Sequence, residues 1–86
     1  MKRLPSRPNA RAAAAAQLSR ALGLERAGHR EEAAEAYGQA VRLNPDDPEA
    51  QTRLGLVLRE LGRDEEANRA FLSALRLREA LAFGVR

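Results

Sequence analysis

Apolar residues recur at spacings of three and four along most of the chain. The clearest run is Ala50, Leu54, Val57, Leu58 and Leu61. This spacing places the apolar side chains on one side of an α-helix. Equivalent runs predict four helices in all, near residues 12–27, 31–43, 48–61 and 65–82. The pattern predicts no β-strand.

Residues typical of helix ends lie between the predicted helices. Asp47 is expected to cap the third helix. Gly28 and Gly62 are expected to let the chain leave the first and third helices in a left-handed conformation. Asp64 is expected to cap the fourth helix. Arg30 occupies the equivalent position before the second helix, so we expect that cap to be weaker by about 1 kcal/mol.

The second half of the chain repeats the first. A shift of 34 residues lays residues 14–47 over residues 48–81, and 12 of the 34 pairs are then identical. The identical pairs include Gly28 with Gly62, each followed after two residues by Glu-Glu-Ala. A repeat of this length is typical of proteins built from stacked helical hairpins.

The repeated unit resembles the tetratricopeptide repeat, in which small residues let two helices approach and a large residue fills the space between neighbouring pairs. The residues that match its motif are Ala21, Leu24, Ala33, Tyr37 and Pro45 in the first copy, and Leu54, Gly55, Leu58, Ala67 and Phe71 in the second. Four residues depart from the motif, and three of them are Gln17 and Gln51, where tryptophan is common, and Glu79 in place of the final proline. Arg20 stands where leucine is expected, so this side of the first helix is either solvated or meets an acid.

The resemblance implies an all-α fold, a solenoid of two stacked helix-turn-helix repeats with a C-terminal helical extension. Residues 1–11 form a basic arm that we expect to be disordered. Residues 12–47 and 48–81 form the two repeats, and residues 82–86 form a C-terminal cap or tail. Ala33 and Ala67 are expected at close helix contacts, whereas Ala34 and Asn68, one residue along, are expected to tolerate leucine.

The composition argues against catalysis and against bound cofactors. The chain has no cysteine and one histidine, His29, so the usual thiol chemistry and multi-histidine metal sites are excluded. No serine has a partner histidine in a triad-like pattern, and no glycine-rich phosphate loop is present. The apolar runs are too short to cross a bilayer. We therefore expect a cytoplasmic protein that is not an enzyme and holds no metal or cofactor.

In the resembled family, the first helix of each repeat lines a concave groove that receives a peptide or a partner helix. The resemblance thus implies a protein-binding adaptor. The groove positions in this chain are Ala15, Leu18, Leu22, Glu25, Arg26, Glu49, Thr52, Leu56, Arg59 and Glu60.

Two repeats are fewer than solenoids usually need to cover their apolar faces. One remedy is that the alanine-rich first helix and the final extension cap the stack. The other is a homo-oligomer in which the open end of one chain stacks on another and continues the solenoid. We favour the second, with contacts expected at Leu72, Leu75, Leu81 and Phe83.

Positive charge is concentrated at the start of the chain, where residues 1–30 hold seven bases and one acid. The arm's bases are Lys2, Arg3, Arg7 and Arg11. An alternative function is therefore an accessory protein that attaches to nucleic acid or an anionic surface through this arm. Aromatic residues for base stacking are absent from the arm, which argues against nucleic acid as a partner.

Overall fold

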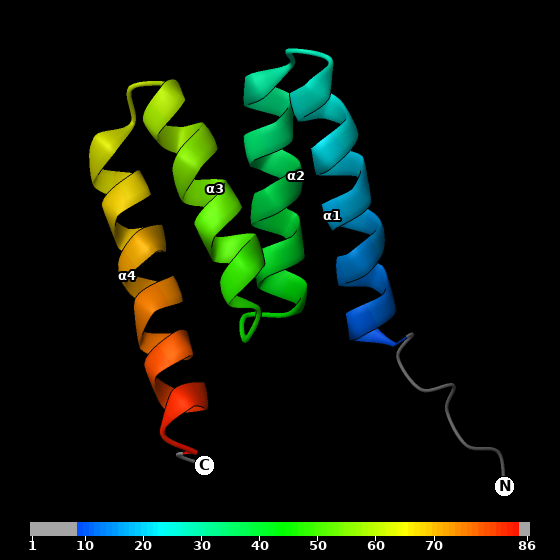
Figure 1. Cartoon of the computed structure of the whole chain (residues 1–86). Helices are drawn as coiled ribbons and strands as arrows, with labels where there is room; N and C mark the ends of the chain where they lie inside the picture. Colours follow the sequence, from blue (N-terminus) through cyan, green and yellow to red (C-terminus); the bar gives the residue numbers. More distant parts are fainter. Residues whose placement is uncertain (1–8, 85–86) are drawn as a thin grey trace, which may run out of the picture.

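The computed structural model describes residues 9–84, which form four α-helices in a row (Figure 1). The helices are α1 (Ala10–Arg26), α2 (Arg30–Leu43), α3 (Pro48–Glu60) and α4 (Asp64–Ala82). Every helix end lies within two residues of the predicted position, and this described part contains no strand. The all-α prediction is confirmed. The arm residues Lys2, Arg3 and Arg7 lie outside the described residues.

Helices α1 and α3 each have a side-chain cap at the amino-terminal end. The Oδ1 atom of Asp47 accepts hydrogen bonds from the backbone N–H groups of Glu49 and Ala50 at 3.0 and 3.4 Å, as predicted. Asn9 caps α1 in the same way, with the N–H of Arg11 at 3.1 Å. Because α1 begins at Ala10 rather than near residue 12, Arg11 lies in its first turn and not in the arm.

The prediction that Asp64 caps α4, and that Arg30 holds the equivalent capping position before α2, is wrong. Helix α4 already includes Asp64, and the residue before it is Arg63. His29 holds the equivalent place before α2, and neither side chain makes a capping hydrogen bond. Asp64 instead adds negative charge to the positive end of the helix. The two helices therefore begin alike, and the expected difference of about 1 kcal/mol between their caps has no structural basis.

Gly28 and Gly62 form the two tight turns within the hairpins. Their φ angles are 87° and 80°, in the left-handed region that favours glycine. After each glycine the next N–H, of His29 or Arg63, donates to the carbonyl five residues back at 2.9 Å. This is the Schellman arrangement, which satisfies carbonyl groups at a helix end. The repeated glycines thus set both turns.

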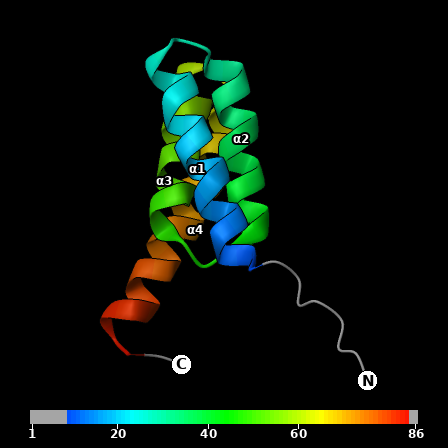
Figure 2. The ribbon, with the colours of Figure 1, turned by 90° about the vertical axis from the view of Figure 1, so that its right-hand side faces the viewer.

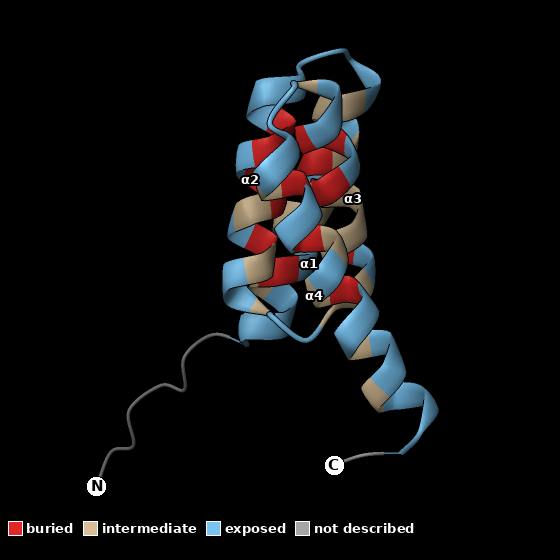
Figure 3. Cartoon of the chain, turned by 90° about the vertical axis from the view of Figure 1, so that its left-hand side faces the viewer, coloured by how far each residue is buried: buried red, intermediate tan, exposed pale blue. Residues whose placement is uncertain are grey.

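Each hairpin packs two antiparallel helices, α1 with α2 and α3 with α4, and the hairpins join where α2 meets α3. The buried residues lie along the inside of this stack (Figure 3). Most of them are alanines, and the largest fully buried side chains are Tyr37 and Val57. Gly55 is buried as well, and the buried hydrophobic residues are Ala14, Ala21, Ala33, Ala34, Ala36, Tyr37, Ala40, Ala50, Val57, Leu58, Ala67, Ala70 and Ala74.

Ala33 and Ala67 are buried at equivalent places, as predicted, with at most 1% of their surface exposed. The expectation that Ala34 tolerates leucine is wrong, because Ala34 is also buried. Helix α2 is covered on two sides, by α1 and by α3. Helix α4 packs substantially against α3 only. The counterpart Asn68 on α4 is exposed for this reason.

The C-terminal extension is the end of α4 itself. Helix α4 has 19 residues and α3 has 13, and the two are aligned at their shared turn. The last turns of α4 therefore project about 9 Å beyond α3, at a rise of about 1.5 Å per residue, as Figure 2 shows. Leu81 lies seven residues after the buried Ala74, on the same side of the helix. It is exposed because α3 does not reach it.

Gly55 brings α3 and α4 together at the ring of Phe71. A Cβ atom at Gly55 would lie 2.6 Å from Phe71 Cε1, closer than real carbon atoms approach. The guanidinium of Arg59 lies 5.7 Å from the centre of the same ring. The aromatic ring is thus held between a position that requires glycine and a cation.

We predict that Ala33→Leu and Ala67→Leu each lower the free energy of unfolding by about 1–3 kcal/mol, because a leucine overpacks these contacts. The control is Ala16→Leu, the same substitution at an exposed position of α1, which should change stability by less than about 0.5 kcal/mol. Urea unfolding followed by circular dichroism measures the difference. Equal losses at all three positions would contradict the assigned helix faces.

We predict that Gly55→Ala destabilises the fold by about 1–2 kcal/mol, because the methyl group displaces the Phe71 ring. The matched control is Gly23→Ala in α1, where no atom lies within 4 Å of the added Cβ. That variant should gain up to about 1 kcal/mol from helix propensity. Thermal unfolding of the pair tests this, and a stabilised Gly55→Ala variant would show that the contact is loose.

Candidate functional site

The ten groove residues inferred from the sequence lie on α1 and α3, the first helices of the two hairpins. They form five equivalent pairs in the repeat, such as Leu22 with Leu56 and Glu25 with Arg59. Their surroundings differ between the two copies. Several polar members are bound to other parts of the fold, whereas the leucines differ mainly in how far they are exposed.

Glu25 joins α1 to α2 through the only tyrosine of the chain. The Tyr37 hydroxyl donates a hydrogen bond to Glu25 Oε1 at 2.6 Å. The tyrosine side chain is fully buried. Burial, and then the hydrogen bond and negative charge of Glu25, raise the pKa of Tyr37 to about 12, although Arg53 nearby opposes this. Glu25 therefore has a structural role, which the sequence analysis did not anticipate.

Glu60 joins the two hairpins. Its Oε1 atom accepts a hydrogen bond from Arg30 Nε at 3.0 Å, which links the end of α3 to the start of α2. Both side chains are about half exposed, so this ion pair adds little stability and mainly fixes the relative position of the hairpins.

Two further groove residues are also bound within the chain. Glu49 Oε2 accepts from Arg53 Nε at 3.1 Å, one helical turn along α3. The Thr52 hydroxyl donates to the carbonyl of Pro48 at 2.9 Å and lies 3.5 Å from a terminal nitrogen of Arg78 on α4. With Arg59 held over Phe71, most of the polar groove residues of α3 have partners inside the fold.

The three leucines of the predicted groove are exposed to different degrees. Leu18 and Leu22 on α1 are partly buried and pack against the core. Leu56, the counterpart of Leu22, is 37% exposed on α3. Ala15 and Arg26 are exposed on α1. This face therefore presents apolar side chains at equivalent places on two successive first helices.

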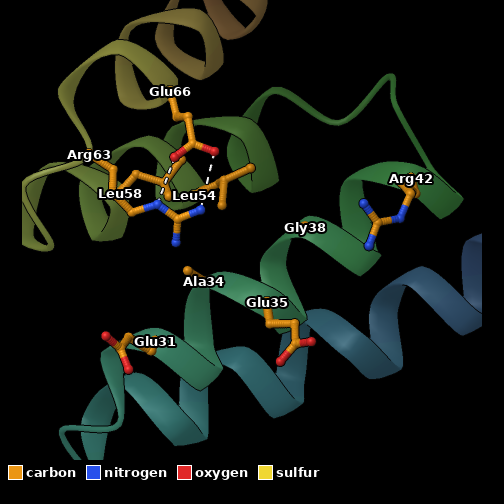
Figure 4. A pocket seen from close by; sticks show the side chains of 9 residues that line it. All are labelled: Glu31, Ala34, Glu35, Gly38, Arg42, Leu54, Leu58, Arg63 and Glu66. Atoms are coloured by element: carbon orange, nitrogen blue, oxygen red, sulfur yellow. Dashed lines mark hydrogen bonds and ion pairs between the residues drawn. The ribbon is translucent and has the colours of Figure 1, made fainter.

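A cleft that the sequence analysis missed lies where the two hairpins join. It has a volume of about 470 Å³ and is formed by α2, α3 and the start of α4. Ala34 and Gly38 of α2 line one side, and Leu54 and Leu58 of α3 line the other (Figure 4). The charged residues at its rim are Glu31, Glu35, Arg42, Arg63 and Glu66.

Two of the charged residues at this rim, Arg63 and Glu66, form an ion pair with each other. Arg63 binds both carboxylate oxygens of Glu66, at 2.6 and 3.2 Å, which lowers the pKa of that carboxyl group. No single pattern in the sequence indicated the cleft, because its residues come from three separate helices and share no motif. Only the stacking of the hairpins brings them together.

The side chains predicted for self-association are exposed on α4. Leu72 and Leu75 are 50% and 52% exposed on its outer side, whereas Leu81 and Phe83 are 69% and 78% exposed in its projecting end. They therefore form two separate groups rather than one patch.

Residues 9–84 contain neither a cluster of metal ligands nor a membrane-spanning helix. These residues hold no group of three or more potential metal ligands from histidine, cysteine, aspartate and glutamate. Among the same residues, no helix is long and apolar enough to span a membrane.

Comparison with known families agrees with the stacked hairpins. The sequence model of the tetratricopeptide repeat family matches residues 18–82, which include most of α1 and all of the other three helices. This chain belongs to the tetratricopeptide repeat family. A comparison with curated proteins gives no significant match. The tetratricopeptide repeat in general forms adaptors for protein–protein interaction, and its domains are typically non-catalytic scaffolds.

We predict that Tyr37 ionises near pH 12, above the usual value of 10. The unfolded chain releases this proton first, so the contribution of Tyr37 to stability should be constant below pH 10 and fall between pH 10 and about 12. The fall is at most about 1.4 kcal/mol per pH unit. The chain has one tyrosine and no tryptophan, so ultraviolet absorbance of tyrosinate measures this group alone.

Tyr37→Phe is the control for this prediction, because it removes the ionising group. Its stability should lack the additional fall above pH 10. A native titration midpoint near pH 10 would contradict the buried hydrogen bond between Tyr37 and Glu25.

Proposed function

We propose that this tetratricopeptide repeat protein is an adaptor that binds a peptide or a helix of another protein across α1 and α3. The observation that supports this most directly is the exposure of Leu56, at 37%, in the place equivalent to Leu22 on α1. Leucines at equivalent places on successive helices suit a partner that lies across both. Such a partner would cover Leu56 and the exposed parts of Leu18 and Leu22.

The charged neighbours indicate the chemistry of the partner. Helix α1 ends with an acid followed by a base, Glu25 and Arg26. At the equivalent places α3 has a base followed by an acid, Arg59 and Glu60, so the order of the two charges is reversed. Glu25, Arg59 and Glu60 already have partners in the fold, whereas Arg26 is exposed. We therefore expect a mostly apolar segment with an acidic residue positioned to meet Arg26.

The test selects binding peptides from a random peptide library displayed on phage, with the full chain immobilised. We predict that Leu56→Glu weakens the selected peptides by about tenfold or more, because it places a charge in the apolar contact. The control is Leu72→Glu on α4, which should leave the affinity unchanged. Isothermal titration calorimetry measures both variants. Equal affinities for Leu56→Glu and the unaltered chain would contradict the proposal.

A deletion separates this function from attachment through the basic arm. Removal of residues 2–8 keeps Asn9, which caps α1, and removes Lys2, Arg3 and Arg7. Peptide binding across α1 and α3 should survive the deletion and tolerate added salt. Binding that is lost in the deletion and falls steeply with salt would instead support the arm as the site.

A further inference from the structure

The contact between α2 and α3 shows what this chain uses to stack one hairpin on the next. On α2 the residues are small, with Ala34 buried and Gly38 half-buried. Facing them across the cleft are Leu54 and Leu58 of α3 (Figure 4). Large side chains of a first helix thus face small residues of the preceding second helix.

The outer face of α4, which we define as Asn68, Leu72, Leu75 and Glu79, does not offer the same small residues. Asn68 and Leu72 stand at the places of Ala34 and Gly38, and all four residues of this face are exposed. A helix that approached α4 as α3 approaches α2 would meet leucine and asparagine where it needs alanine and glycine. The outer face of α4 is therefore unsuited to a further hairpin of the same kind.

The opposite end of the stack is also unsuited to such a contact. In α1, Arg20 takes the place of Leu54 and is exposed, whereas Leu24 takes the place of Leu58 and packs against the core. Helix α1 thus has only one of the two leucines with which α3 faces α2. The residues at both ends therefore argue against the end-to-end stacking of copies that the sequence favoured.

The outer face of α4 has instead the spacing of a coiled-coil contact. Its four residues lie four, three and four positions apart, as in alternating a and d positions of a heptad. The two central positions are leucine, and the two outer positions are the amide Asn68 and the carboxylate Glu79. An amide donates hydrogen bonds and a carboxylate accepts them, so this face is complementary to itself.

We propose that a second copy of this chain packs antiparallel on the outer face of α4, around a two-fold axis between Leu72 and Leu75. Leu72 then contacts Leu75 of the partner subunit, and the amide of Asn68 donates to Glu79 of the partner subunit. The axis repeats both contacts. A parallel pair would place Glu79 beside Glu79 of the partner subunit, which like-charge repulsion disfavours.

The proposed contact is small. Two helices that meet over about three turns bury less than the roughly 1,200 Å² of stable interfaces, so the dissociation constant should be about 10 μM or weaker. Arg69 and Arg76 flank the outer face on one side and bring positive charges of the two subunits near each other.

Sedimentation equilibrium of the full chain between about 5 and 500 μM tests the dimer. We expect the mass to rise with concentration from 9.4 kDa toward twice that value. Leu72→Glu should remain a monomer with an unchanged helical circular dichroism spectrum. Leu56→Glu, on α3, should dimerise like the unaltered chain. A monomer at all concentrations, or a dimer that Leu56→Glu disrupts and Leu72→Glu does not, would overturn the proposal.

Cross-linking tests the orientation without relying on a charged variant. The chain has no cysteine, so Asn68→Cys and Glu79→Cys each introduce a single thiol. When the two variants are mixed in equal amounts and oxidised, the antiparallel dimer should give mainly the disulfide between positions 68 and 79. Dominant linkage of two copies of position 68 would overturn the antiparallel arrangement, as would no linkage at dimer-forming concentration.

This proposal and the adaptor function fail independently. Leu72→Glu should lose the dimer and keep peptide binding, and Leu56→Glu should do the reverse. Loss of both properties in either variant would show that one surface serves both.

Discussion

The fold depends on the close approach of helices through alanine. Ten of the thirteen buried hydrophobic residues among residues 9–84 are alanines, and the exceptions are Tyr37, Val57 and Leu58. An alanine buries little apolar surface, so each contact contributes less than a leucine contact does. In return, the helix axes lie close enough for a single aromatic residue, Tyr37 or Phe71, to fill the space left within a hairpin. Small changes of volume at these alanines should therefore affect the fold more than changes of charge at the surface.

This constraint divides the surface by position in the stack rather than by sequence. The two repeats are similar, yet α2 is covered on two sides and α4 mainly on one. Equivalent residues consequently have different surroundings: Ala34 is buried between the hairpins, whereas Asn68 is exposed. The two proposed contact surfaces, the face of α1 and α3 and the outer face of α4, lie on different helices. Under the two proposals, one chain would hold a second copy of itself and a different molecule at the same time.

The sequence predicted regular features well because they repeat. The period of 34 residues, the glycines at the turns and the helical spacing located each helix to within two residues. Features that depend on non-equivalent pairs were missed. The bond from Tyr37 to Glu25 has no counterpart in the second copy, where Phe71 and Arg59 hold those places. The cleft and the burial of Ala34 depend on how two hairpins meet, which no local pattern encodes.

The unlike ends of the molecule bear on how such arrays grow in evolution. A gene duplication that joined two copies of residues 9–84 head to tail would bring Leu72 of the first copy to Arg20 of the second. Neither residue suits that junction, so the fused protein would contain two separate stacks joined by a flexible connection. A continuous array of four hairpins would first require replacement at those positions.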